Sequence, residues 1–237
     1  MGTDNLLSKK RAGRKKREVE VRNHRTTTWL LLTEGEKTEI SYFNGFVDYL
    51  NRTGSRKIEV EPYGLGTNTK NVATKAEDYF AFYNKLHSKK RIPYEKIIFV
   101  FDRDSFPKEH FNTAIQMAKQ RYPNCIVAWS NESFELWLRL HFEYVSSAQT
   151  RYQHNDRLTD IFRDRGVFTS KQNYNDHGKS LANIFEIIVN CGGSYEAAIH
   201  NAKNLLKGQD LSSPVKINPA TMVYDAVEAL IEESITH

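Results

Sequence analysis

The segment KIIFVFDRDS, Lys96–Ser105, constrains the fold of this chain more than any other. An uninterrupted apolar run, Ile97–Phe101, is followed by two aspartates, Asp102 and Asp104, with one arginine between them. A short apolar run that is rich in β-branched and aromatic residues predicts a strand buried on both faces of a sheet. The aspartates then stand at the carboxyl end of that strand, which is where α/β sheets bind their ligands.

Asp102 and Asp104 are also spaced for a shared ligand. Residues two apart on a strand point to the same side, about 6–7 Å apart along it. Two carboxylates at that separation can share one metal centre, and their oxygens suit Mg²⁺ or Mn²⁺. The alternative is a strand that simply ends in solvent, with aspartate favoured in the following turn. For so short a motif this alternative is favoured until other segments are considered.

The rest of the first 142 residues alternates between strand-like and helix-like patterns. Short apolar or alternating segments predict further strands at Trp29–Leu32, Ile58–Gly66 and Cys125–Trp129. Apolar residues at spacings of three and four predict a helix after each strand: Ile40–Leu50, Val72–Leu86, Glu109–Gln120 and Ser133–Phe142. This repeat indicates an α/β fold with a compact, mostly parallel four-stranded sheet flanked by helices.

The remaining residues, 143–237, show helical patterns without a convincing strand. These patterns lie near Thr159–Arg163, Leu181–Val189, Ala197–Leu206 and Met222–Ile231. We therefore expect three parts: a basic disordered arm over residues 1–25, an α/β domain over 26–142, and a helical C-terminal region over 143–237.

The arm carries most of the net charge. Nine Lys or Arg residues and three acidic residues lie between Met1 and Arg25, which gives +6. The whole chain has a net charge of +5, so the remainder carries −1. A basic arm on a nearly neutral body indicates a phosphate contact with nucleic acid, although a solubilising tail has the same composition.

Composition restricts the location of the protein. No apolar stretch approaches the roughly 18–20 residues that span a bilayer, and the chain does not open with a signal-peptide pattern. Cys125 and Cys191 lie far apart, without the spacing of a zinc site. We expect a reduced, cytoplasmic protein that does not enter a membrane.

A third acid strengthens the metal hypothesis. Glu34 follows the strand expected at Trp29–Leu32, just as Asp102 and Asp104 follow theirs. If the two strands are neighbours, three carboxylates meet at one edge of the sheet. Their mutual repulsion would require a compensating cation. The alternative is that these are surface acids scattered at the starts of loops.

Four blocks of the sequence, in order along the chain, carry a resemblance to a known family. They are TEGEKTEISYF (Thr33–Phe43), FDRD (Phe101–Asp104), SNESFELWLRLHF (Ser130–Phe142) and NPATMVYDAVEAL (Asn218–Leu230). Together they resemble the RloB / AbiLii family of bacterial defence loci. These proteins are Toprim-like and related to the OLD-family nucleases. The resemblance runs from about Thr26 to the C-terminus.

The resemblance implies a compact Toprim-like domain in which Glu34, Asp102 and Asp104 hold Mg²⁺ or Mn²⁺ and are catalytic residues. It also implies a further acid after the next strand, for which Glu135 is the candidate metal ligand and catalytic residue. The family more often has proline at the position of Glu132, so either Glu132 or Glu135 could reach the metal. Both could instead be first-turn acids that complement a helix dipole.

The resemblance further implies a metal-dependent nuclease that cleaves DNA or RNA, with tRNA among the candidates, in anti-phage defence. It implies an ATPase partner from the same locus, and Toprim nucleases often form homo-oligomers. The alternative is a non-catalytic subunit that binds nucleic acid or the ATPase. Lys179 could neutralise the transition state or cap a helix, whereas His141 and His177 are expected to be structural.

Overall fold

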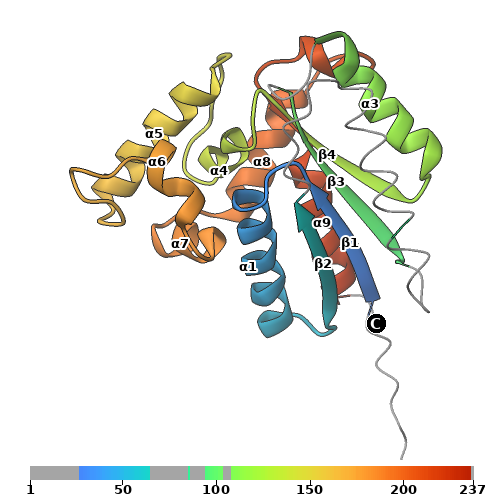
Figure 1. The fold of residues 1–237 in the computed structure, drawn as a ribbon, viewed down its shortest axis with the longest axis horizontal. Helices are drawn as coiled ribbons and strands as arrows, with labels where there is room; N and C mark the ends of the chain where they lie inside the picture. The colour runs from blue at the N-terminus through green and yellow to red at the C-terminus, as the bar shows by residue number, and fades with distance from the viewer. Residues whose placement is uncertain (1–26, 65–84, 86–93, 104–107, 236–237) are drawn as a thin grey trace, which may run out of the picture.

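The computed structural model describes residues 27–64, 85, 94–103 and 108–235, and Figure 1 shows its ribbon. Its sheet has the strand order β2-β1-β3-β4-β5. The strands are β1 Thr27–Thr33, β2 Ile58–Gly64, β3 Lys96–Asp102, β4 Cys125–Asn131 and β5 Ala220–Thr221. The first four are parallel, and β5 runs antiparallel to β4. The predicted α/β class with a mostly parallel sheet is therefore confirmed.

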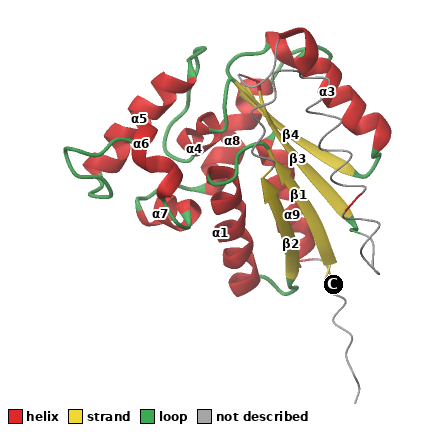
Figure 2. Ribbon diagram, viewed as in Figure 1, coloured by secondary structure: helices red, strands yellow, loops and turns green. Residues whose placement is uncertain are grey.

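Helices flank this sheet and continue beyond it, as Figure 2 shows. The α-helices of the described residues are α1 Thr38–Thr53, α3 Lys108–Arg121, α4 Glu135–Leu140, α5 Arg151–Asp164, α6 Tyr174–His177, α7 Ile184–Asn190, α8 Tyr195–Leu206 and α9 Val223–Ile235. The helix expected at Val72–Leu86 and the basic arm over residues 1–25 lie outside the described residues.

The sheet is buried on both faces because successive strand residues point to opposite sides. On β1, Trp29 and Leu31 belong to one core cluster, with residues of α1 and α9. Leu30 and Leu32 belong to a second cluster, with residues of α3. All four side chains have no exposed surface, which is what the uninterrupted apolar runs of the sequence require.

The fifth strand corrects the prediction of four strands and of a C-terminal region without strands. Ala220–Thr221 forms only two register pairs, Thr221 with Ser130 and Ala220 with Asn131. The hydroxyls of Ser130 and Thr221 are also hydrogen-bonded at 2.9 Å. Two residues are too few to show a periodicity, so this strand depends on contacts with β4 that are distant in sequence.

The C-terminal helices share a core with the sheet. The cluster that contains Trp29 also contains Leu158 of α5, Ile184 of α7, Ala198 of α8 and Val227 of α9. Among the described residues, no helix has the length and apolar character needed to cross a membrane.

Candidate metal-binding active site

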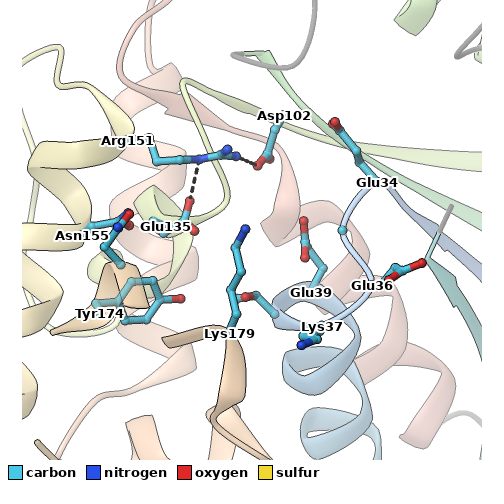
Figure 3. A pocket seen from close by; sticks show the side chains of 13 residues that line it. Glu34, Glu36, Lys37, Glu39, Asp102, Glu135, Arg151, Asn155, Tyr174 and Lys179 are labelled. Carbon is cyan, nitrogen blue, oxygen red and sulfur yellow. Dashed lines mark hydrogen bonds and ion pairs between the residues drawn. The ribbon is translucent and has the colours of Figure 1, made fainter. Parts of the chain in front are cut away.

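A pocket of about 410 Å³ lies at the carboxyl edge of the sheet, where the sheet meets the C-terminal helices (Figure 3). It receives residues from the ends of β1 and β3, from α1 and α4, and from α5, α6 and the turn after α6. The lining residues are Glu34, Gly35, Glu36, Lys37, Thr38, Glu39, Asp102, Glu135, Arg151, Asn155, Tyr174, Asn175 and Lys179.

Neighbouring parallel strands bring Glu34 and Asp102 together. β1 and β3 pair directly, and Thr33 is level with Val100. Glu34 follows Thr33, and Asp102 is two residues beyond Val100, so the two acids leave the sheet at nearly the same level. Adjacent strands are only about 4.8 Å apart. Both acids line the pocket, whereas Asp104 lies outside the described residues.

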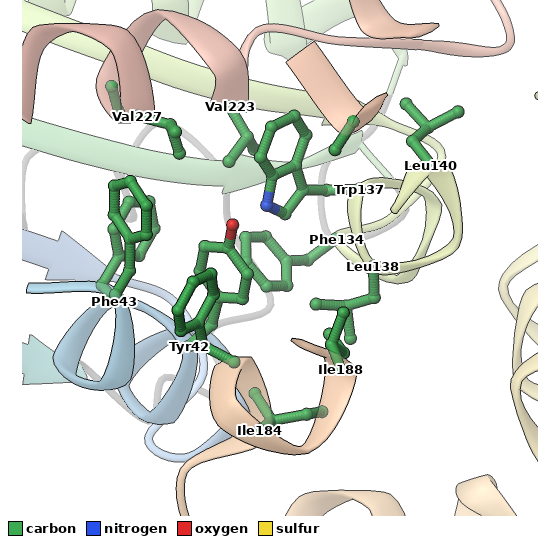
Figure 4. Close-up of a cluster of buried hydrophobic side chains, with 14 of the residues drawn as sticks. Tyr42, Phe43, Phe134, Trp137, Leu138, Leu140, Ile184, Ile188, Val223 and Val227 are labelled. Atoms are coloured by element: carbon green, nitrogen blue, oxygen red, sulfur yellow. The ribbon is translucent and has the colours of Figure 1, made fainter. Parts of the chain in front are cut away.

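Glu135 reaches the same pocket from α4, a helix whose described side chains are all buried. Its neighbours Phe134 and Trp137 pack edge-to-face against Tyr42 of α1, as the cluster in Figure 4 shows. This aromatic packing extends to α7 through Phe185, whose ring is 5.6 Å from that of Tyr42. Glu135 therefore stands on a rigid support.

Of the two acids proposed after β4, Glu135 lines the pocket and Glu132 does not. The Oε2 atom of Glu132 accepts a hydrogen bond of 3.1 Å from the backbone N–H of Arg151. Its Oε1 atom lies 3.7 Å from the guanidinium of Arg103. Glu132 thus links the start of α5 to Arg103, the residue that follows β3, with which it forms an ion pair.

Glu39, in the first turn of α1, is a further acid that lines the pocket. Its carboxylate lies against the backbone of Gly35, where an added Cβ would be 2.5 Å from Oε2. A side chain at position 35 would therefore require the Glu39 carboxylate to shift. Burial, together with the negative charges of Glu135 and Glu34, raises the pKa of Glu39 to about 7. The pocket therefore concentrates negative potential.

The opposite wall comes from the C-terminal region and was not predicted, apart from Lys179. Arg151 is the first residue of α5, Asn155 is one turn later, and Tyr174 begins α6. Figure 3 shows the Tyr174 hydroxyl and the Lys179 amine pointing into the pocket. The sequence does signal the helix start, because Thr150 and Gln153 form a capping box, but nothing local shows that α5 faces the acids.

His141 and His177, which were expected to be structural, are not among the residues that line the pocket. His141 is buried, and its Nδ1 atom is 3.0 Å from the Trp137 carbonyl oxygen. Since a carbonyl only accepts, Nδ1 carries the proton, and Nε2 accepts from the Tyr42 hydroxyl at 3.1 Å. Burial lowers the pKa of His141 to about 4, which keeps the ring neutral.

The donor set fits a hard divalent cation. Glu34, Asp102 and Glu135 supply carboxylate oxygens, the ligands that Mg²⁺ and Mn²⁺ prefer. The buried Oε2 atom of Glu135 has the Nε atom of Arg151 3.5 Å away but accepts no hydrogen bond within the described structure, so it keeps a coordination position for a metal ion. Across the described residues, no three His, Cys, Asp or Glu side chains are already arranged around a metal position. A cation held by the described acids alone would therefore require their side chains to rearrange.

A family model described as RloB-like protein matches residues 29–230. No curated protein and no solved structure gives a significant match. The matched stretch extends from β1 into α9 and includes every residue that lines the pocket.

Proposed function

The chain belongs to the RloB-like family, and we propose that it is a metal-dependent, Toprim-type nuclease. Its reaction would be the hydrolysis of phosphodiester bonds in DNA or RNA, with tRNA among the candidate substrates, during bacterial anti-phage defence. An ATPase from the same locus is the proposed partner. One observation carries the proposal: acids from three separate segments, β1, β3 and α4, line the same pocket.

The residues of the pocket divide into two proposed roles. Glu34, Asp102 and Glu135 would hold Mg²⁺ or Mn²⁺, with Asp104 as a further predicted ligand. The cation would supply charge stabilisation for the phosphodiester and activation of a water nucleophile. On the opposite wall, Lys179 and the Tyr174 hydroxyl would donate hydrogen bonds to phosphate oxygens and orient the scissile bond.

A specific observation favours a second candidate function. Arg151 already forms ion pairs with Asp102 and Glu135, and ion pairing neutralises acids without any metal. The same pocket could therefore belong to a non-catalytic subunit that binds nucleic acid or the ATPase. Only an assay of cleavage separates the two functions.

The test is a cleavage assay with the full chain, Mg²⁺ or Mn²⁺, and three substrates: duplex DNA, single-stranded DNA and total tRNA. It is run with and without the partner ATPase. We expect metal-dependent cleavage that Glu34→Gln and Asp102→Asn each reduce by about 100-fold or more.

Glu228→Gln is the matched control. Glu228 is a carboxylate in a surface ion pair with Lys203, outside the pocket lining, so its loss should leave cleavage unchanged. Absence of cleavage of all three substrates, even with the partner, would favour the non-catalytic function. Undiminished cleavage by the two pocket variants would contradict the assigned site.

A further inference from the structure

The guanidinium of Arg151 lies between two of the carboxylates that we assign to the metal (Figure 3). Its Nη2 atom donates to Asp102 Oδ2 at 2.9 Å, and its Nε atom is 3.5 Å from Glu135 Oε2. These two acids belong to different elements, β3 and α4. The side chain of Arg151 thus bridges them in the position that a shared cation would take.

The backbone of Arg151 is fixed. Thr150 caps α5 through a capping box with Gln153, and the N–H of Arg151 donates to Glu132 Oε2. Any movement of the charge must therefore come from the arginine side chain, which is long and flexible.

The arginine is also the partner that is open to solvent. Its side chain is 37% exposed, whereas those of Asp102 and Glu135 are 4% and 9% exposed. The acids are enclosed by the sheet and by α4. A guanidinium can move into water at small cost, because it keeps its charge and finds solvent partners, but the two buried carboxylates cannot be left without a cation.

We propose that Arg151 is an exchangeable internal cation. In the metal-free protein its guanidinium neutralises Asp102 and Glu135 and holds them together. A divalent cation replaces it there, and the side chain swings towards solvent while α5 stays in place. Arg151 is thus a positioning residue that sets the metal affinity, and this role rests on the metal site of the proposed function.

The test is the affinity for Mn²⁺ alone, measured by isothermal titration calorimetry on the full chain. If the cation must displace the guanidinium, Arg151→Met removes a competitor and should tighten Mn²⁺ binding roughly tenfold or more. Arg151→Lys keeps the charge without the fork of donors, so its affinity should lie between those of the wild type and Arg151→Met. Circular dichroism checks that both variants are folded.

Lys37→Met separates exchange from a general field effect. Lys37 lines the same pocket, and in the described structure it forms no ion pair with Asp102 or Glu135, so its loss removes one charge without removing the bridge. We expect a much smaller gain in Mn²⁺ affinity for Lys37→Met than for Arg151→Met.

Three outcomes would overturn the exchange. Equal gains in Mn²⁺ affinity for Arg151→Met and Lys37→Met would show a general effect of charge instead of exchange. Unchanged or weaker Mn²⁺ binding by Arg151→Met would contradict the exchange but leave the metal site in place. Absence of Mn²⁺ binding by every form of the protein would instead remove the metal site, and the proposed function with it.

Discussion

At the scale of single residues, the acids after β4 show how the same residue type takes two roles. The carboxylate of Glu132 accepts a hydrogen bond from the start of α5 and forms an ion pair with Arg103, whereas Glu135, three residues later, lines the pocket. The sequence could not separate the two, because both stand where a helix dipole favours acids. Only the packing of α4 directs Glu135 to the other acids.

His141, at the end of α4, helps to hold the helix that carries Glu135. Its neutral ring joins α4 to α1 by accepting from Tyr42, and its burial excludes the charged form. Protonation would remove this acceptor and place a charge in an aromatic core.

The free energy of unfolding should therefore depend on pH through His141. Its pKa is lowered to about 4 in the folded state, below the value of 6.5 for an unperturbed histidine. Its contribution is thus complete above pH 6.5 and is lost as the pH falls towards 4, because the unfolded state then binds more protons. The loss should be roughly 3 kcal/mol.

Urea unfolding of wild type and His141→Gln at several pH values measures this contribution. The stability advantage of the wild type should shrink between pH 6.5 and 4. An advantage that stays constant over that range would show that His141 does not titrate as its burial indicates.

At the scale of elements, the hydrophobic pattern of the sequence was enough to locate the four parallel strands. The ranges expected from apolar runs fall within or overlap β1, β2, β3 and β4, and a strand buried on both faces has a distinctive composition. The direct pairing of β1 with β3, which brings Glu34 beside Asp102, was assumed in the metal hypothesis but could not be predicted from the sequence. Strand order depends on packing between distant segments, which no local pattern records.

Elements held by distant hydrogen bonds were missed for the same reason. The segment before β5 is fastened to the end of β4 by Asn131, whose buried amide donates to the carbonyl oxygens of Ile217 at 2.8 Å and Val215 at 3.2 Å. The α5 wall of the pocket is another case, because its capping box marks a helix but not the direction it faces.

Asn131→Ala should destabilise the protein by roughly 1–3 kcal/mol, because buried carbonyl groups lose their donor. Urea unfolding of the variant measures the change. Asn201→Ala is the matched control, since the half-buried amide of Asn201 donates to a single carbonyl, that of Leu140, and should cost less. A loss no larger than that of the control would contradict the role given to Asn131.

At the scale of the whole molecule, one core joins the sheet to the C-terminal helices, and the pocket lies where they meet. The sequence predicted the acids on the sheet side, with Glu135, but assigned no facing wall except through Lys179. Arg151, Asn155 and Tyr174 come from a polar stretch in which no single residue stands out. Their role follows from tertiary packing, which places them opposite the acids.

The central claim is that acids from β1, β3 and α4 hold one divalent cation. Anomalous diffraction from crystals of the full chain grown with Mn²⁺ tests it most directly. The account predicts an anomalous peak in the pocket, with oxygens of Glu34, Asp102 and Glu135 roughly 2 Å away. Mn²⁺ bound only outside the pocket, or a pocket without a peak at saturating Mn²⁺, would contradict it.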